Sequence, residues 1–281
     1  MSLETALSFR SVLNTQRKFT KAYNWSSPVY KHLQRLKVAV SYVTCLPLTK
    51  IDFDEPMLLH GLSKYLPCAG LIIGTLLFAL NSVLSVSRAE PIVVGFLLTV
   101  TWLILTNGLH FDGLMDAADG IFSHQSKERM LEIMADSRVG NFGAITGFIV
   151  LLGKFVTIYS LTGASLGACL IVIPAWSRWC ELYAIGKFPY AKEYGKGKIW
   201  HDTTAYPKDL AKGALPPLAV TLAFGLVGYP IVWTAMIFCI ASGVIFSHIM
   251  NKKLGGQTGD TYGATVEISE LVCLLGLSVF T

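Results

Sequence analysis

Three aspartates in one short segment carry the strongest chemical signal in the chain. Asp112, Asp116 and Asp119 stand at positions i, i+4 and i+7 of the run NGLHFDGLMDAADG, so a helix would project all three from one face. Like charges at this spacing repel one another, and a bound cation is the simplest compensation. Oxygen ligands without nearby thiolates favour Mg²⁺ or Mn²⁺ over zinc. The segment therefore predicts a divalent metal site, with a solvated acidic loop as the alternative.

Asp136 would bring a further carboxylate to this site. A short helix is expected from an N-cap at Ser126 to Asp136. It would separate the segment with the three aspartates from the segment at Asp136, and the two could close on one site. Asp136 is accordingly a candidate metal ligand, or else a helix-end residue. His110, at the start of the acidic run, is a candidate general base or orienting donor, with a structural histidine as the alternative.

The glycine-rich run GGQTGDTYGA, residues 255–264, stands directly before the last apolar stretch. At a helix N-terminus its backbone N–H groups would bind phosphate, with Thr258 and Gly259 at the contact. Asp260 would then reach the metal. Glycine-rich turns are common, so this run alone is weak evidence for a phosphate site, and the carboxylates that follow it strengthen the prediction.

Charged residues within the apolar stretches are the next candidates, because intramembrane charges usually serve function. Glu267 and Glu270 follow the glycine-rich run and are candidate substrate contacts. Arg178 would bind a phosphate, or would pair with Glu181 three residues later as a structural ion pair. Lys154 is expected to complement Glu267 or Glu270.

The composition indicates an integral membrane protein. Hydrophobic residues make up 53% of the chain and charged residues 15%, and the mean hydropathy is +0.53, which is too apolar for a soluble domain. Stretches of about 17 to 25 apolar residues span a bilayer as helices. The sequence predicts an all-α, polytopic helix bundle with about seven such spans and short cytoplasmic helices in the loops. The spans are expected at residues 66–86, 91–106, 140–162, 164–185, 214–228, 231–250 and 264–280.

Lys and Arg are distributed unevenly between the two sides of this bundle. Nearly all lie before the first span or in the loops after the second, fourth and sixth, whereas Arg88 stands on the opposite side. The positive-inside rule then places the N-terminus and these three loops in the cytoplasm, in a multi-pass protein of the inner membrane, with the C-terminus outside. The net charge of +5 is mainly this topology signal, and no nucleic-acid partner is expected.

Residues 1–35 form a basic segment with Glu4 as its one acid, and they are expected to lie on anionic membrane lipid, a targeting extension being the alternative. Residues 36–281 are expected to form a single transmembrane catalytic domain. The six cysteines stand singly without a C-x-x-C pair, which speaks against a disulfide framework or a zinc site. The oligomeric state is left open, a homo-oligomer included.

Four blocks of sequence resemble the cobalamin synthase family, also called the adenosylcobinamide-GDP ribazoletransferases. They are SKYLPCAGLIIG (63–74), NGLHFDGLMDAADG (107–120), LEIMADSRVGNFG (131–143) and GGQTGDTYGATVEISE (255–270). The resemblance covers roughly residue 36 to the C-terminus, and the basic extension before it is longer than is usual in the family. It implies a polytopic membrane enzyme that uses Mg²⁺ to complete the nucleotide loop of the B12 coenzyme.

The resemblance implies transfer of adenosylcobinamide phosphate from adenosylcobinamide-GDP to α-ribazole or its 5′-phosphate, with release of GMP. Metal carboxylates and cationic groups suit this chemistry. Arg138 and Arg178 would contact phosphate, and a carboxylate such as Asp116, or His110, would accept the ribazole hydroxyl proton. The metal ligands would be Asp112, Asp116, Asp119, Asp136 and Asp260.

Two other classes of protein are the alternatives. CDP-alcohol phosphotransferases share D-G-containing helices and metal, but Asp116 and Ala117 stand where their pattern has Ala and Arg. An ion-coupled transporter would place its carboxylates at the membrane midplane, in broken helices of related halves. Here the aspartates lie mainly in predicted loops, and the sequence contains no visible repeat.

Overall fold

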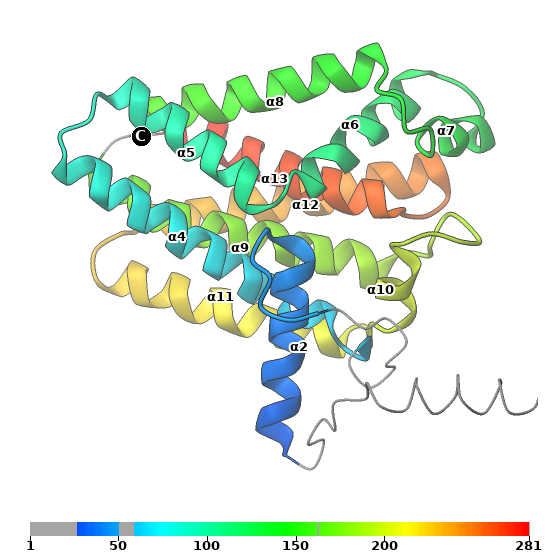
Figure 1. Cartoon of the computed structure of the whole chain (residues 1–281), viewed down its shortest axis with the longest axis horizontal. Helices are drawn as coiled ribbons and strands as arrows, with labels where there is room; N and C mark the ends of the chain where they lie inside the picture. Colours follow the sequence, from blue (N-terminus) through cyan, green and yellow to red (C-terminus); the bar gives the residue numbers. More distant parts are fainter. Residues whose placement is uncertain (1–26, 51–58, 162, 281) are drawn as a thin grey trace, which may run out of the picture. The chain divides into compact units, whose positions relative to one another are not determined.

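The computed structural model describes residues 27–50, 59–161 and 163–280, and the regular structure within them is helical (Figure 1). By its internal contacts the chain divides into two units, Met1–Gln34 and Arg35–Thr281. The second unit contains the helix bundle and every site described below. The all-α class is thereby confirmed, while the basic segment expected over residues 1–35 falls mainly outside the described residues and stays a prediction.

The helices follow one another with short connections. Proline in the first turn of α4 and of α5 suits a helix start, where its missing N–H costs no bond. The short helix expected after Ser126 is confirmed, because the Ser126 side chain accepts a hydrogen bond from Arg129 N at 3.3 Å. The elements are α2 (Pro28–Val43), η1 (Ser63–Tyr65), α4 (Leu66–Val86), α5 (Pro91–Leu105), α6 (Leu109–Phe122), α7 (Lys127–Ile133), α8 (Asn141–Ser160), α9 (Gly163–Lys187), α10 (Lys198–Asp202), α11 (Lys208–Leu226), α12 (Ile231–Leu254) and α13 (Gly259–Phe280).

Several of these helices are long and apolar enough to cross a membrane. In the described part of the chain there are five such candidates, Ser63–Val86, Asn141–Ser160, Leu166–Lys187, Ile231–Leu254 and Gly259–Val279. Helices α5 and α6 qualify only together, with a bend of 88° between them, as a broken span or a re-entrant segment. The membrane bundle is confirmed, but the expected count of seven is not. The span expected at 214–228 lies in α11, which is outside this set and carries Lys208, Asp209 and Lys212 in its first turns.

Helix α9 lies at the centre of the bundle. It packs against α4, α11, α12 and α13. Of its most apolar 18-residue stretch, within Leu166–Lys187, 89% is buried inside the protein. A helix that is covered on all sides has no water for its polar side chains. The charged residues of α9 must therefore find partners on the neighbouring helices.

Four charged side chains from three spans meet in this interior. Lys154 Nζ of α8 donates to Glu267 Oε2 at 2.6 Å and to Glu270 Oε2 at 2.5 Å, which confirms the predicted partner of Lys154. Arg178 Nη1 of α9 donates to Glu270 Oε1, which also accepts from Ser177 Oγ at 2.9 Å. Two cations thus balance two carboxylates in an environment that stabilises isolated charges poorly.

The ion pair considered between Arg178 and Glu181 does not form. Arg178 is fully buried and pairs with Glu270, whereas Oε2 of Glu181 lies 3.5 Å from Nε2 of His110 on α6. Spacing along one helix was a poor guide because α13 packs beside Arg178 and brings it an acidic partner from elsewhere in the sequence.

Replacing Lys154 by methionine should strongly destabilise the bundle. The substitution leaves two buried carboxylates with Arg178 as their remaining cation, so the free energy of unfolding should fall by about 3–5 kcal/mol, measured by denaturation in detergent. Lys253→Met, at an exposed position near the end of α12, is the control and should unfold like the wild type. The double variant Lys154→Met/Glu267→Gln removes one charge of each sign and should recover much of the loss. Wild-type stability of the single variant would contradict this account.

Candidate active site at one end of the bundle

A sharp turn separates helix α6 from helix α5. Gly108, its N-cap, has φ +65°, and Asn107 before it has φ +51°, a left-handed conformation that glycine adopts without strain. The two helices consequently meet at 88°. This turn places α6 beside the first turns of α13, near the loops that join α9 to α11 and α12 to α13 (Figure 1).

Two glycines bring α6 and α13 into close contact. A Cβ atom on Gly113 of α6 would meet the backbone of Asp260, and one on Gly263 of α13 would meet the backbone of His110. Small residues at a crossing of this kind let two helix backbones approach closely. The aspartates of α6 and the first turn of α13 therefore lie along one narrow seam.

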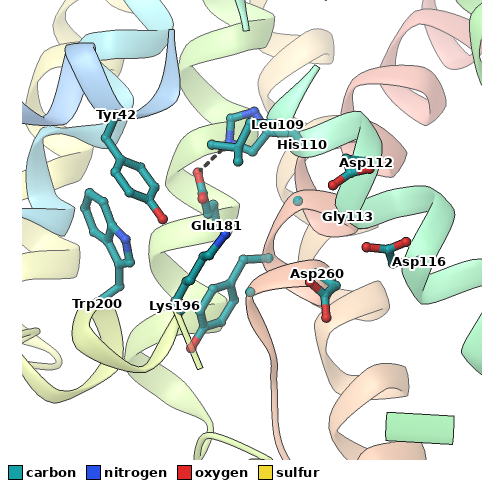
Figure 2. Close-up of a pocket in the computed structure, with 14 residues that line it drawn as sticks. Tyr42, Leu109, His110, Asp112, Gly113, Asp116, Glu181, Lys196, Trp200 and Asp260 are labelled. Carbon is teal, nitrogen blue, oxygen red and sulfur yellow. Dashed lines mark ion pairs between the residues drawn. The ribbon is translucent and has the colours of Figure 1, made fainter. Parts of the chain in front are cut away.

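Asp112, Asp116 and Asp260 line one pocket at this seam, with a volume of about 250 Å³ (Figure 2). Asp112 is exposed and the other two are partly buried. Lys192 Nζ lies 3.5 Å from Asp260 Oδ2 and partly offsets the negative charge. Asp260 also accepts a hydrogen bond from Thr258 Oγ1 at 3.2 Å. The structure thus brings together three aspartates from two distant segments of the sequence.

Hard carboxylate oxygens of this kind suit Mg²⁺. In the part of the chain that is described, however, no group of three or more His, Cys, Asp or Glu side chains converges closely enough to hold a metal ion. The chemistry of the donors fits a hard cation, and the side chains would have to close in to bind it.

Asp119 has a defined structural partner. Its Oδ2 accepts a hydrogen bond from Gly140 N and its Oδ1 accepts one from Gly143 N, both at 2.8 Å. Gly140 is the N-cap of α8, which has no side-chain cap of its own, so the carboxylate of α6 satisfies the free N–H groups at the start of α8. The structure gives Asp119 a helix-capping role, and its predicted role as a metal ligand stays a prediction.

Asp136 and Arg138 form an exposed pair in the loop before α8. Arg138 Nη2 donates to Asp136 Oδ2 at 2.7 Å, and the Arg138 side chain is 87% exposed. The hydrogen bonds from Arg138 lower the pKa of Asp136 to about 2. Neither residue belongs to the wall of the pocket, so their proposed contacts with metal and phosphate stay predictions.

The remaining predicted residues fall into two groups. His110 and Gly259 line the pocket, and Thr258 lies beside it, where its backbone N–H donates to Thr261 Oγ1 at 2.8 Å. Arg178, Glu267 and Glu270 instead belong to the buried ion pairs of the bundle. Their predicted contacts with substrate are untested, and in this conformation they bind one another or Lys154.

Several residues of the pocket were not singled out from the sequence. They come from α2, α9, α10, α13 and the loop before α10, namely Tyr42, Glu181, Trp200, Tyr262 and Lys196. Glu181 was noted only as a possible partner of Arg178. No motif connects these residues, and only the packing of the helices brings them together.

Comparison with known proteins decides the family. The profile described as cobalamin-5-phosphate synthase matches residues 35–278. The chain belongs to the cobalamin-5-phosphate synthase family. It is a membrane transferase of cobalamin assembly, as the four sequence blocks predicted.

Named relatives of this chain cover nearly the same region. The adenosylcobinamide-GDP ribazoletransferase of Desulfitobacterium hafniense (strain Y51) is 36% identical over 247 residues, which are 87% of this chain and 96% of the relative. The enzyme of the same name from Thermosynechococcus vestitus is 34% identical over 241 residues, 86% of this chain and 94% of the relative. No solved structure matches the chain.

Removing the carboxylate of Asp119 should destabilise the protein. Asp119→Ala leaves the N–H groups of Gly140 and Gly143 without their acceptor, at an expected cost of about 1–3 kcal/mol in unfolding free energy, whereas Asp119→Asn keeps one acceptor oxygen and should lose less. Glu132→Ala is the control and should be near neutral, because Glu132 is exposed and forms a surface ion pair with Arg129 of the same helix. Unchanged stability of Asp119→Ala with abolished activity would instead favour a chemical role.

Proposed function

We propose that this protein transfers the adenosylcobinamide-phosphate group from adenosylcobinamide-GDP to α-ribazole or α-ribazole 5′-phosphate. The names of its relatives support the substrates. The observation that carries the proposal is the meeting of Asp112, Asp116 and Asp260 in one pocket. A carboxylate cluster with lysines at its rim suits a pyrophosphate held through a divalent cation.

The reaction we propose is a direct displacement at phosphorus. A ribose hydroxyl oxygen of ribazole forms a bond to the phosphorus that carries adenosylcobinamide, and the bond from that phosphorus to the oxygen of GMP breaks. The hydroxyl proton passes to an acceptor in the pocket, for which Asp116 and His110 are the candidates. Stereochemical inversion at a chiral phosphorus is expected, whereas retention would indicate an enzyme-bound intermediate.

The residues of the chain would mainly position charge. Asp112, Asp116 and Asp260 would hold Mg²⁺, which when bound neutralises negative charge on the phosphates. Lys196, at the exposed rim of the pocket, would attract the anionic donor. Lys192 would give up its ion pair with Asp260 when the metal binds, and would then bind a phosphate of the donor. Little covalent work is left to the protein.

We further propose that the pocket faces the cytoplasm from the inner membrane. The loops around it, between α6 and α8, α9 and α11, and α12 and α13, together with the helix ends that flank them, carry most of the basic residues that follow the first span. Such loops are retained on the cytoplasmic side. A large polar corrinoid nucleotide would then reach the carboxylates without crossing lipid.

Asp116→Asn should reduce GMP release and cobamide formation by about 100-fold or more, because it removes a charge that positions the pyrophosphate. The assay uses purified protein in lipid with adenosylcobinamide-GDP, α-ribazole and Mg²⁺. Glu128→Gln, an exposed acid in the first turn of α7, is the control and should retain wild-type rates. Full activity of Asp116→Asn at equal expression would remove this residue from the site.

Chelation with EDTA should abolish the transfer, and Mg²⁺ should restore it. Because a ligand that binds the folded state raises its stability, Mg²⁺ should also raise the melting temperature of the wild type. Asp116→Asn should lose this shift while Glu128→Gln keeps it. Full activity of a metal-depleted sample, verified by elemental analysis, would contradict the metal proposal.

A further inference from the structure

The side of the pocket opposite the aspartates is aromatic (Figure 2). Tyr42 of α2 and Trp200 of α10 lie edge to face, with ring centroids 4.9 Å apart. Tyr262 of α13 adds a third aromatic ring to the lining of the pocket, with its ring centroid 6.3 Å from that of Tyr190. Burial raises the pKa of the Tyr42 phenol, so its hydroxyl stays protonated. This aromatic wall, defined as Tyr42, Trp200 and Tyr262, serves none of the steps described above.

Buried polar groups without hydrogen bonds lie next to the aromatic wall. Both ring nitrogens of His110, Glu181 Oε2 and Tyr262 Oη have no hydrogen-bond partner within the described structure, although His110 Nε2 and Glu181 Oε2 approach to 3.5 Å. The three residues are between 2% and 7% exposed. Native proteins leave few buried polar atoms unsatisfied, so several in one pocket indicate a polar ligand that completes them.

A second cavity adjoins this pocket at Asp112. It has a volume of about 480 Å³, and it shares Tyr42, Leu109 and Asp112 with the first. The carboxylate of Asp112 therefore lies where two spaces meet. A two-substrate displacement needs this arrangement, because the attacking and leaving groups stand on opposite sides of the transferring phosphorus.

We propose that the aromatic wall is a nucleoside subsite, in which a planar bicyclic base packs against Trp200 and Tyr42 while its ribose reaches toward Asp112. This inference rests on the proposed function, whose donor and acceptor both contain such a nucleoside: guanosine in the donor and α-ribazole in the acceptor. Glu181 and His110 hydrogen-bond the polar edge of the base or the ribose hydroxyls.

The size and chemistry of the pocket select a nucleoside over the corrinoid. A volume of about 250 Å³ lies just below the range of roughly 300–1,000 Å³ that is usual for small-ligand pockets, so the pocket suits a small group such as a base and a sugar and is too small for a corrin macrocycle. The corrinoid would remain outside, at the wider cavity. Aromatic side chains bind bases by stacking on their faces, largely independently of base identity.

Steady-state kinetics of Trp200→Leu test the subsite. Loss of stacking should raise the KM of one nucleoside-bearing substrate about tenfold or more, with a smaller change in kcat, and Trp200→Phe should restore most of the affinity. A rise in KM for α-ribazole identifies the acceptor as the occupant, and a rise for adenosylcobinamide-GDP identifies guanosine of the donor. Titration calorimetry with α-ribazole and with GMP gives the same assignment without turnover.

Tyr194→Leu is the matched control, because Tyr194 is 79% exposed in the loop before α10 and lies outside the pocket wall. It should leave both KM values unchanged. Because Trp200 is only 5% exposed, melting curves must show that each variant is folded before its kinetics are compared. If Trp200→Leu does not fold, the comparison of Tyr42→Leu with Tyr42→Phe repeats the test. Folded variants of both positions with both KM values within twofold of wild type would overturn the subsite. Absence of transfer by the wild type would instead refute the proposed function.

Discussion

The pairing of Glu270 with Lys154 and Arg178 is the interaction on which the arrangement of this bundle depends. It joins α13 to α8 and to α9 where no water is available to stabilise an unpaired charge. An apolar helix surface can slide or rotate at little cost, but a buried ion pair has one satisfactory geometry. We infer that this network fixes the depth and rotation of α13 in the bundle.

The position of α13 matters because its first turn forms part of the candidate active site. Asp260 reaches the pocket at the start of the same helix that carries Glu267 and Glu270. Close contact through Gly113 and Gly263 then sets α6 against α13, and the carboxylate of Asp119 ties α6 to the start of α8. The acidic wall of the pocket, defined as Asp112, Asp116 and Asp260, is thus assembled from helices that the interior ion pairs and one helix cap hold in place.

The pocket has two chemically different sides, which suits an enzyme that must bind phosphate and a nucleoside together. Its acidic side comes from α6 and α13, and its aromatic side from α2, α10 and α13. Both lie at the end of the bundle where the loops connecting α6 to α8, α9 to α11 and α12 to α13 also lie (Figure 1). A membrane transferase of this family can thereby bind polar substrates at one end of an apolar helix bundle.

The sequence alone determined the class of the protein, its family, most of its helices and the aspartates of the acidic wall. These features are local: apolar length predicts spans, Ser126 predicts a cap, and Asp112 and Asp116 share a helix face through their spacing. The partner of Lys154 was also predictable, because a buried cation needs a carboxylate and few are available within the spans.

Only the tertiary structure decided the partner of Arg178, the capping role of Asp119 and the aromatic wall. Each depends on residues far apart in the sequence, and helix packing rather than helical spacing determines which of them meet. Glu181 lies three residues from Arg178, yet α13 brings Glu270 to that guanidinium and α6 brings His110 to Glu181. The sequence specifies which charges must be neutralised inside a membrane, and the packing of the helices selects the groups that neutralise them.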